Sequence, residues 1–344
     1  MKKFLLGAAI LSLAAFCPVY SACAEEVFEL SYAHPVGPTH PIHIASAKLF
    51  KDMEEESGGR LKVTIYDSNT LVKMPGVLKA LKDGGTDIGY INVSSVQNDM
   101  PYTVAHDINF AVSGSVNAGK LLEEMEKLPE VKKELTDNNC IYLFGHCSDR
   151  FSIGSLKDPI RTPADLKGKR VLTVQSNLAD EITNWGGTPV LVGIPDCYVA
   201  LQRGMGDCVY TALPLYCSIK LHELLKHITI MPSTFSGNII AINKEAFEDL
   251  PEDIQKIMLK HSGYDSTVYM CQMTADAGDR DVKIMQDAGI DIITLTPEEL
   301  EQWKSLSVAG LQQQWIDTLK RGGVKDPEPF IAKVREMATA VEAQ

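Results

Sequence analysis

The sequence predicts an α/β protein built from two lobes. Three observations support this prediction: a length of 344 residues, an alternation of short strands with amphipathic helices, and a second start of that alternation near Leu166. A single hydrophobic core stops growing at roughly 250–300 residues, so a chain of this length is expected to divide. The natural ligand site of such a protein is the cleft between the lobes.

The first set of elements follows residue 25. Strands are expected at 28–32, 61–65 and 87–91, and helices at 42–53 and 77–81. Each expected helix has its apolar residues on one face and is followed by glycine, which commonly ends helices. This strand–helix–strand order predicts a mainly parallel sheet covered on both faces.

The second set has expected strands at 170–174, 188–192 and 207–210, with helices at 179–185 and 195–203. From about residue 245 the pattern is mostly helical. Ligands of open α/β sheets bind beyond the carboxyl ends of the strands. The loops expected at the mouth of the cleft are therefore 33–40, 89–95, 145–152, 172–177 and 208–213.

The first 24 residues have the pattern of a secretory signal peptide. Lys2 and Lys3 precede the apolar run 4–16, and small residues end the segment at Ala24. That run is too short to span a bilayer comfortably, which disfavours a retained anchor helix. We expect cleavage before Glu25 and a periplasmic protein.

Lipidation of Cys23 is a second possible processing route. Ser21 and Ala22 precede this cysteine as in a lipoprotein cleavage site, although Tyr20 occupies a position where leucine is usual. Either route places the protein outside the cytoplasmic membrane.

Composition excludes some partners and chemistries. A formal net charge of −12 gives no general attraction for phosphate backbones, so nucleic acid is not an expected partner. Six cysteines follow Ala24, at 140, 147, 197, 208, 217 and 271, without any CxxC spacing. An exported protein can form disulfides, but apolar surroundings favour buried free thiols here.

No catalytic or cofactor motif is present. GxSxG, HExxH, P-loop and GxGxxG patterns are absent from the sequence, so we expect neither catalysis nor a cofactor. His34, His40 and His43 have a spacing that could hold a metal, but they lack clustered carboxylates or thiols and are interpreted as loop and helix histidines. His146 and Cys147 are adjacent on an expected strand and point to opposite faces, which disfavours an activated thiol.

Arg150 is the first candidate for the cleft. It follows the apparent strand 141–144 by a few residues, where a guanidinium could bind an anion. A surface salt bridge is the alternative interpretation.

The residues resemble those of a known family, the periplasmic solute-binding proteins of tripartite ATP-independent periplasmic (TRAP) transporters, which includes C4-dicarboxylate-binding proteins. The resemblance depends on the order and spacing of short motifs rather than on any one of them. These motifs occupy residues 31–41, 57–65, 79–89, 160–169, 187–190, 198–207 and 243–252.

The resemblance implies the two-lobed periplasmic binding protein fold, with a ligand cleft between the lobes and a long connecting helix. It implies one lobe from 25–148 plus about 238–275, a second lobe from 149–237, and C-terminal helices at 276–344 that pack on the lobes. It also implies a small organic anion as ligand, and small and large membrane subunits of a permease as partners.

Family site positions can be transferred to this sequence. The polar, aromatic and apolar positions of the cleft correspond to Asn92, Ser94, Ser95, Ile194, Tyr210, Thr211, Ser236 and Asn238. His34 and His40 join them from the first loop. Arg150 matches one family arginine.

The other family arginine, which binds the solute carboxylate, is replaced by Leu172. Arg170 lies two residues earlier and could share the strand face with this position if the register slips. Without that bidentate partner, a planar carboxylate loses two parallel charge-assisted hydrogen bonds. A tetrahedral anion is favoured instead, because its outward-pointing oxygens can accept from donors placed separately around it. The hypothesis is therefore a small sulfonate such as isethionate, ahead of a dicarboxylate. An aromatic acid that stacks on Tyr210 or Trp185 is an alternative.

Overall fold

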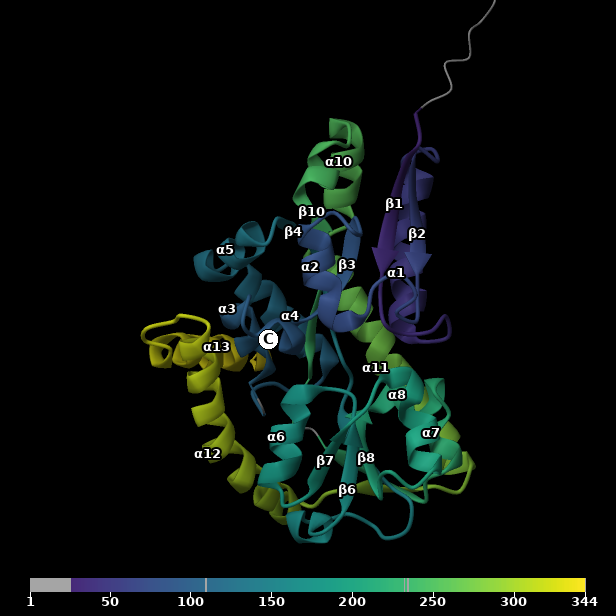
Figure 1. The fold of residues 1–344 in the computed structure, drawn as a ribbon, viewed down its shortest axis with the longest axis vertical. Helices are drawn as coiled ribbons and strands as arrows, with labels where there is room; N and C mark the ends of the chain where they lie inside the picture. Colours follow the sequence, from purple (N-terminus) through teal and green to yellow (C-terminus); the bar gives the residue numbers. More distant parts are fainter. Residues whose placement is uncertain (1–25, 109, 232, 234, 344) are drawn as a thin grey trace, which may run out of the picture.

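The computed structural model describes residues 26–108, 110–231, 233 and 235–343. The expected signal peptide at 1–24 and the lipidation candidate Cys23 lie outside these residues. The molecule is elongated, and its two lobes are stacked along the long axis, each built on its own sheet (Figure 1). The predicted α/β fold with two lobes is confirmed.

The first lobe contains a sheet of five strands in the order β2-β1-β3-β10-β4. β1 is parallel to β2 and β3, whereas β10 is antiparallel to both of its neighbours. All residues of the central strands β3 and β10 are buried, as expected of strands covered on both faces. The strands are β1 Phe28–Ala33, β2 Leu61–Tyr66, β3 Ile88–Asn92, β4 Cys140–Cys147 and β10 Gly237–Asn243.

Helices on both faces of this sheet bury its apolar side chains. α1 begins where His40 Nδ1 accepts a hydrogen bond from the Ile42 N–H (3.2 Å), with Pro41 as the first helical residue. It ends at Ser57, before Gly58, whose φ of 65° an L residue rarely adopts. The helices are α1 Pro41–Glu56, α2 Val77–Lys82, α3 Pro101–Val104, α4 Ser115–Glu126, α5 Pro129–Asp137, α9 Lys244–Glu248 and α10 Glu252–Lys260.

The second lobe contains six strands in the order β11-β9-β5-β8-β6-β7. The antiparallel strand β5 separates two parallel parts, β11-β9 and β8-β6-β7. The elements are β5 Phe151–Ser155, β6 Arg170–Thr173, β7 Thr188–Leu191, β8 Cys208–Ala212, β9 His227–Met231, β11 Asp291–Thr294, α6 Ser176–Asn184, α7 Cys197–Gln202 and α8 Leu213–Ser218.

β11 lies in the segment for which the sequence predicted helices alone. It is a four-residue edge strand with two exposed positions, and a segment this short carries little periodic signal. It extends the sheet of the second lobe by pairing with β9.

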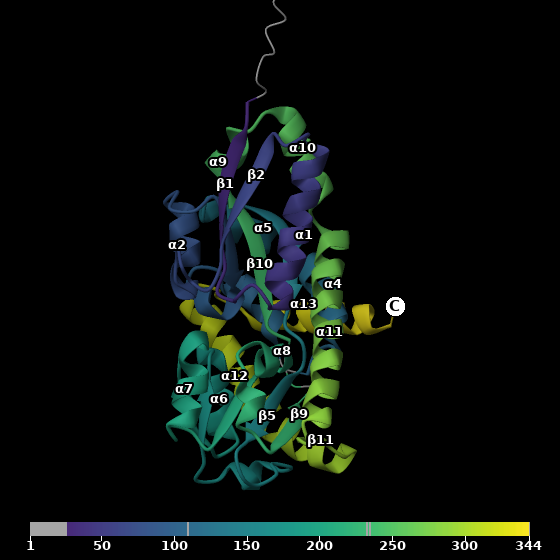
Figure 2. The same ribbon diagram turned by 90° about the vertical axis from the view of Figure 1, so that its right-hand side faces the viewer.

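Two chain crossings and one long helix connect the lobes. The chain passes from β4 directly into β5, and it returns from β9 into β10. α11, Tyr264–Asp287, packs on α1, α4 and β4 in one lobe and on α8 and β11 in the other. Figure 2 shows α11 running along both lobes. At 1.5 Å per residue its 24 residues span about 36 Å.

The last two helices cover one side of the molecule. α12, Pro297–Arg321, contacts α6 and α3, and α13, Glu328–Glu342, packs on α4. α12 begins with a capping box, in which Thr296 and Glu299 satisfy each other's backbone N–H groups. None of the helices formed by the described residues is long and apolar enough to cross a membrane.

Gly278 allows the crossing from β4 to β5 to approach α11 closely. A side-chain carbon at this position would lie 1.8 Å from Asp149 Oδ2. We expect Gly278→Ala to lower the free energy of unfolding by about 1–3 kcal/mol despite the better helix propensity of alanine, because overpacking forces neighbours apart. Urea unfolding measures the change.

Gly85→Ala is the matched control, since its added carbon would be 3.5 Å or more from any neighbour. Equal stability of Gly278→Ala and the wild-type protein would contradict the close packing of α11 on the crossing.

Candidate functional site

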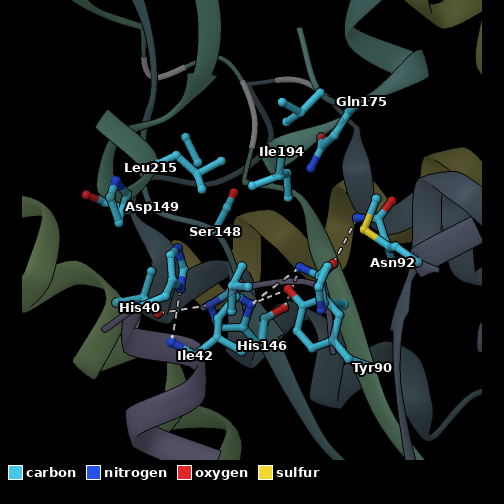
Figure 3. Close-up of a pocket in the computed structure, with 18 residues that line it drawn as sticks. His40, Ile42, Tyr90, Asn92, His146, Ser148, Asp149, Gln175, Ile194 and Leu215 are labelled. Atoms are coloured by element: carbon cyan, nitrogen blue, oxygen red, sulfur yellow. Dashed lines mark hydrogen bonds between the residues drawn. The ribbon is translucent and has the colours of Figure 1, made fainter. Parts of the chain in front are cut away.

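A pocket with a free volume of about 60 Å³ lies between the lobes, where β1, β3, β6 and β8 end (Figure 3). We call it the inner pocket. Both lobes, the β4–β5 crossing and α11 contribute to its walls, so a molecule inside would contact both lobes and two of the three segments that connect them. It is lined by Pro35, Val36, His40, Ile42, Met74, Tyr90, Asn92, His146, Ser148, Asp149, Val174, Gln175, Ile194, Ala212, Pro214, Leu215, Asn238 and Thr274.

The inner pocket adjoins a larger space of about 630 Å³, which we call the outer cleft. The two share residues of both lobes, including Met74, Gln175 and Ile194. The outer cleft is lined by Pro35, Ser68, Asn69, Lys73, Met74, Pro75, Asn92, Ser95, Val174, Gln175, Leu191, Val192, Gly193, Ile194, Pro195 and Asp196.

A hydrogen-bonded chain forms the floor of the inner pocket. Thr274 donates to the Met270 carbonyl (3.0 Å), so its oxygen is left to accept from His146 Nε2 (2.9 Å). His146 Nδ1 is then the acceptor for the Tyr90 hydroxyl at 3.1 Å. Burial, reinforced by His40, lowers the pKa of His146 to about 3. This ring is therefore neutral and held in one tautomer.

Amide side chains join the neighbouring strands of the first lobe. Asn92 donates to Asn238 Oδ1 at 2.8 Å, and Asn238 donates to the Ser236 carbonyl at 2.9 Å. All three residues are buried. Because these polar groups satisfy one another, they fix the shape of the wall between β3 and β10.

His40 and Gln175 offer polar atoms to the pocket from opposite lobes. Since His40 Nδ1 accepts from the backbone, its neutral ring carries the proton on Nε2. Burial, together with His34, lowers the pKa of His40 to about 3. Gln175 Oε1 is buried and has no hydrogen-bond partner among the described residues. A buried polar atom without a partner is costly, so Gln175 Oε1 is available to accept a hydrogen bond from an O–H or N–H donor in the pocket.

Asp149 is the charged residue in the wall of the inner pocket. Its carboxylate accepts two hydrogen bonds from Arg150, at 3.2 and 3.3 Å, and Arg150 also pairs with Asp279 at 2.6 Å. Burial raises the pKa of Asp149, an effect that the Arg150 charge opposes. Neither chamber is lined by Arg150, whose guanidinium is occupied by the two aspartates.

The inner pocket thus combines apolar walls with neutral hydrogen-bonding groups. Among the described residues, no arginine or lysine lines it, whereas the outer cleft is lined by the basic Lys73 and the acidic Asp196. A negative charge on a bound solute would be stabilised in this pocket by neutral N–H donors and not by a guanidinium.

The structure brings some of the predicted site residues to the cleft. His40, Asn92, Ile194 and Asn238 line the inner pocket, and Ser95 lines the outer cleft.

Other predicted residues lie behind the walls. Ser94 donates to Asp107, and Ser236 accepts from Asn92 within the first lobe. Tyr210 is fully buried and its hydroxyl bonds to Glu181 and Ser233. Thr211 is also fully buried and lines neither chamber.

Three predicted residues lie away from both chambers. Arg170 is at the amino end of β6, where it pairs with Asp207 (3.1 Å), whereas the inner pocket is at the carboxyl end of this strand. Leu172 is fully buried in the core of the second lobe. His34 bonds to His43 at 3.1 Å beside α1. The structure therefore does not place Arg170 where it could replace a guanidinium at Leu172.

Sequence reasoning missed several residues of the pocket. Tyr90, Ser148 and Gln175 fall in loops that were expected at the cleft, and His146 was considered only for thiol chemistry. Their positions at strand ends could have identified them. Thr274 gave no signal, because it lies in the middle of a helix that reaches the pocket only through tertiary packing.

Buried neutral histidines predict a pH dependence of stability. The folded-state pKa values of His40 and His146, about 3, lie below the 6.5 of an exposed imidazole. Their contribution is therefore present above about pH 6.5 and is lost as the pH falls. We expect His146→Gln to flatten this decrease by up to about 1.4 kcal/mol per pH unit, measured by urea unfolding from pH 7 to about pH 4.

Thr339→Ala, on an exposed face of α13, is the control, and its free energy of unfolding should fall with decreasing pH as steeply as that of the wild-type protein. If the free energy of unfolding fell equally with pH in His146→Gln and the wild-type protein, His146 would take up its proton in the folded state as readily as in the unfolded state.

Comparison with known proteins identifies the family. Residues 32–318 match the model of bacterial extracellular solute-binding protein family 7, DctP. The chain is 25% identical over 318 residues to the C4-dicarboxylate-binding periplasmic protein DctP of Rhodobacter capsulatus, which covers 88% of this chain and 90% of that protein. It is 22% identical over 288 residues to the 2,3-diketo-L-gulonate-binding periplasmic protein YiaO of Escherichia coli K12, covering 83% and 85%.

Solved structures agree with the fold. A marine metagenome TRAP solute-binding protein in complex with 3-hydroxybenzoate superposes with a TM-score of 0.84 at 21% identity, covering 92% of this chain and 99% of that one. A TRAP solute-binding protein from Rhodoferax ferrireducens with copurified benzoate gives 0.82 at 19% identity, covering 92% and 98%. The chain therefore belongs to family 7 of the bacterial extracellular solute-binding proteins, the periplasmic solute-binding proteins of TRAP transporters.

Proposed function

We propose that this protein captures a small organic acid in the inner pocket, in the periplasm, and delivers it unchanged to the small and large membrane subunits of a TRAP permease. The observation that carries the proposal is the composition of the pocket wall, which comes from both lobes and from α11. A solute bound there makes its full set of contacts only when the lobes are closed, so binding shifts the population toward the closed state.

The walls favour an acid with one charged group and an apolar body. Val36, Ile42, Val174, Ile194 and Leu215 present hydrocarbon surface to the pocket from both lobes. Each square ångström of apolar solute surface removed from water contributes about 25 cal/mol, so a body without apolar surface would leave these walls unused.

The polar groups favour a monoacid over a dicarboxylate. His40 Nε2–H and the NH2 group of Gln175 can donate to one acidic headgroup from opposite lobes, and Gln175 Oε1 can accept from a hydroxyl of the solute. A second carboxylate would be desolvated without a cationic partner in the inner pocket, at a cost of several kcal/mol. Similar structures hold 3-hydroxybenzoate, benzoate and mandelate, which supports an aromatic monocarboxylate. The small sulfonate isethionate fits the dispersed donors and is our second candidate.

Transport is favoured over catalysis by the state of the two pocket histidines. His40 accepts from the backbone through Nδ1, so it directs an N–H and not a basic nitrogen toward the pocket. Both ring nitrogens of His146 are hydrogen-bonded within the protein, to Tyr90 and Thr274. A general base would instead direct a free nitrogen toward the solute. The relatives are named as binding proteins, which also supports a role in transport.

A thermal-shift screen of ligand-stripped, refolded protein tests the solute class. Benzoate, 3-hydroxybenzoate and mandelate should raise the melting temperature more than isethionate, and isethionate more than succinate, for the reasons given above. A solute at 100 times its dissociation constant adds about 2.7 kcal/mol of stability. Mass spectrometry of the released solute should return it unchanged.

Stabilisation by neutral or cationic solutes alone would contradict an organic acid ligand. Chemical conversion of the solute would contradict a transport protein.

Gln175 should contribute directly to binding of the best acid. Gln175→Ala removes a donor at the end of β6 and should weaken binding about tenfold, equivalent to roughly 1.4 kcal/mol, measured by isothermal titration calorimetry. Gln175→Glu should weaken it further, because it adds a negative charge beside an anionic headgroup.

Arg170→Ala is the control, since Arg170 lies at the opposite end of the same strand. If Arg170→Ala weakened binding more than Gln175→Ala, the acidic headgroup would not be bound beside Gln175.

A further inference from the structure

Two cysteines from different elements meet directly behind the inner pocket. Cys147 is the last residue of β4, and Cys271 lies in the middle of α11, 124 residues later. The Cys147 backbone N–H donates to Cys271 Sγ at 3.3 Å. Both residues are fully buried, and both are thiols in the structure. The two thiol side chains also hydrogen-bond to each other, so the sulfur atoms lie in direct contact.

Neighbouring groups hold the pair in place. A carbon added to Gly119 of α4 would lie 2.6 Å from Cys271 Sγ, so glycine is what allows the thiol to occupy this space. Ser115 donates to the Cys147 carbonyl at 2.8 Å, and His106 Nε2 is 3.6 Å from Cys147 Sγ. The thiols are thus confined between α4, α11 and the end of β4.

The two thiols differ in acidity. Burial raises the pKa of the Cys147 thiol, and the neighbouring Cys271 raises it further. Burial also acts to raise the pKa of Cys271, but hydrogen bonds from the Cys147 thiol and the Cys147 N–H contribute to lowering it overall. Opposite shifts of this kind are expected of two thiols in direct contact, one of which donates a hydrogen bond that the other accepts.

The other cysteines are arranged differently. Cys140 donates to the Asn138 carbonyl, and Cys217 lies 4.0 Å from the Asp281 carbonyl. In the part of the chain that the structure describes, Cys147 and Cys271 are the cysteines joined by a hydrogen bond.

We propose that Cys147 and Cys271 form a disulfide in the exported protein. The periplasm is oxidising, and nearby thiols are converted there by disulfide-bearing oxidants of the thiol–disulfide exchange class. One of the two protein thiolates attacks one sulfur of the oxidant disulfide and releases the other as a thiolate. The second protein thiolate then attacks the sulfur of the first in the mixed disulfide and expels the second oxidant thiolate.

Two protein thiols are thereby oxidised, and the oxidant disulfide is reduced to two thiols, which take up the two protons and two electrons. Because both cysteines are buried, this exchange takes place before the lobe has finished folding.

The cross-link would fix the floor of the solute pocket. His146 and Thr274 hydrogen-bond to each other at 2.9 Å. His146 precedes Cys147 on β4, and Thr274 follows Cys271 by three residues on α11. A covalent bond between β4 and α11 therefore holds together the two segments on which this contact depends. The disulfide itself follows from the thiol geometry and stands independently of the proposed solute.

Alkylation of the full chain, exported to the periplasm with its own leader, tests the disulfide. The protein is denatured without reductant, treated with iodoacetamide, and weighed by intact mass spectrometry. Two of the six cysteines after residue 25 should react only after reduction, and a proteolytic map should recover the peptides of Cys147 and Cys271 as one linked species. Six reactive cysteines in the unreduced protein, or a link between other cysteines, would overturn the proposal.

Reduction provides a second readout. It should lower the melting temperature of the exported protein by roughly 5 °C or more, because the bond closes a loop of more than a hundred residues. The variant Cys147→Ser should lose this response, whereas Cys217→Ala should keep it. A wild-type melting temperature that does not respond to reductant would also contradict the proposal.

Discussion

The packing of α11 against the end of β4 is the interaction on which the rest of the structure depends. One face of α11 contacts the end of β4 and the crossing that follows it. Thr267 accepts from the Gly145 N–H, and Cys271 accepts from the Cys147 N–H. Further along the helix, Thr274 accepts from His146, and Gly278 leaves room for Asp149. These helix positions are spaced three or four residues apart, so they share one stripe. The stripe aligns the crossing segment, the pocket floor and the buried thiols along a single helix.

This arrangement also explains why the pocket is nearly neutral. Its deepest groups are satisfied within the protein, and the charge of Asp149 is compensated by Arg150, which is itself held by Asp279. Buried charges are tolerated only when they are paired, and here the pairing directs the guanidinium toward α11 rather than into the cavity. In the site that we propose, selectivity would depend on apolar shape and on a few N–H and O–H groups, and not on a bidentate arginine clamp.

The sequence predicted well where strands lie and where helices end. It predicted the residues of the site only in part. Strands at 28–32, 61–65 and 87–91 are present as β1, β2 and β3, because local apolar patterns and helix-ending glycines decide them. Asn92 and Asn238 were assigned to the cleft by the resemblance to the family, and both line the inner pocket. Arg170 was misjudged as a cleft residue, since sharing a strand face with Leu172 says nothing about which end of the strand reaches the cleft.

By itself, the sequence determined two α/β lobes, a cleft at the ends of particular strands, and a chain without a catalytic motif. These properties follow from periodicity and residue type, which act over a few neighbouring positions. Only the tertiary structure decided that Thr274 reaches His146 across 128 residues and that Gln175 faces His40 across the pocket. It likewise decided that Cys271 lies against Cys147. The physical reason is that packing of α11 against β4, not any local preference, sets the distances between residues so far apart in the chain.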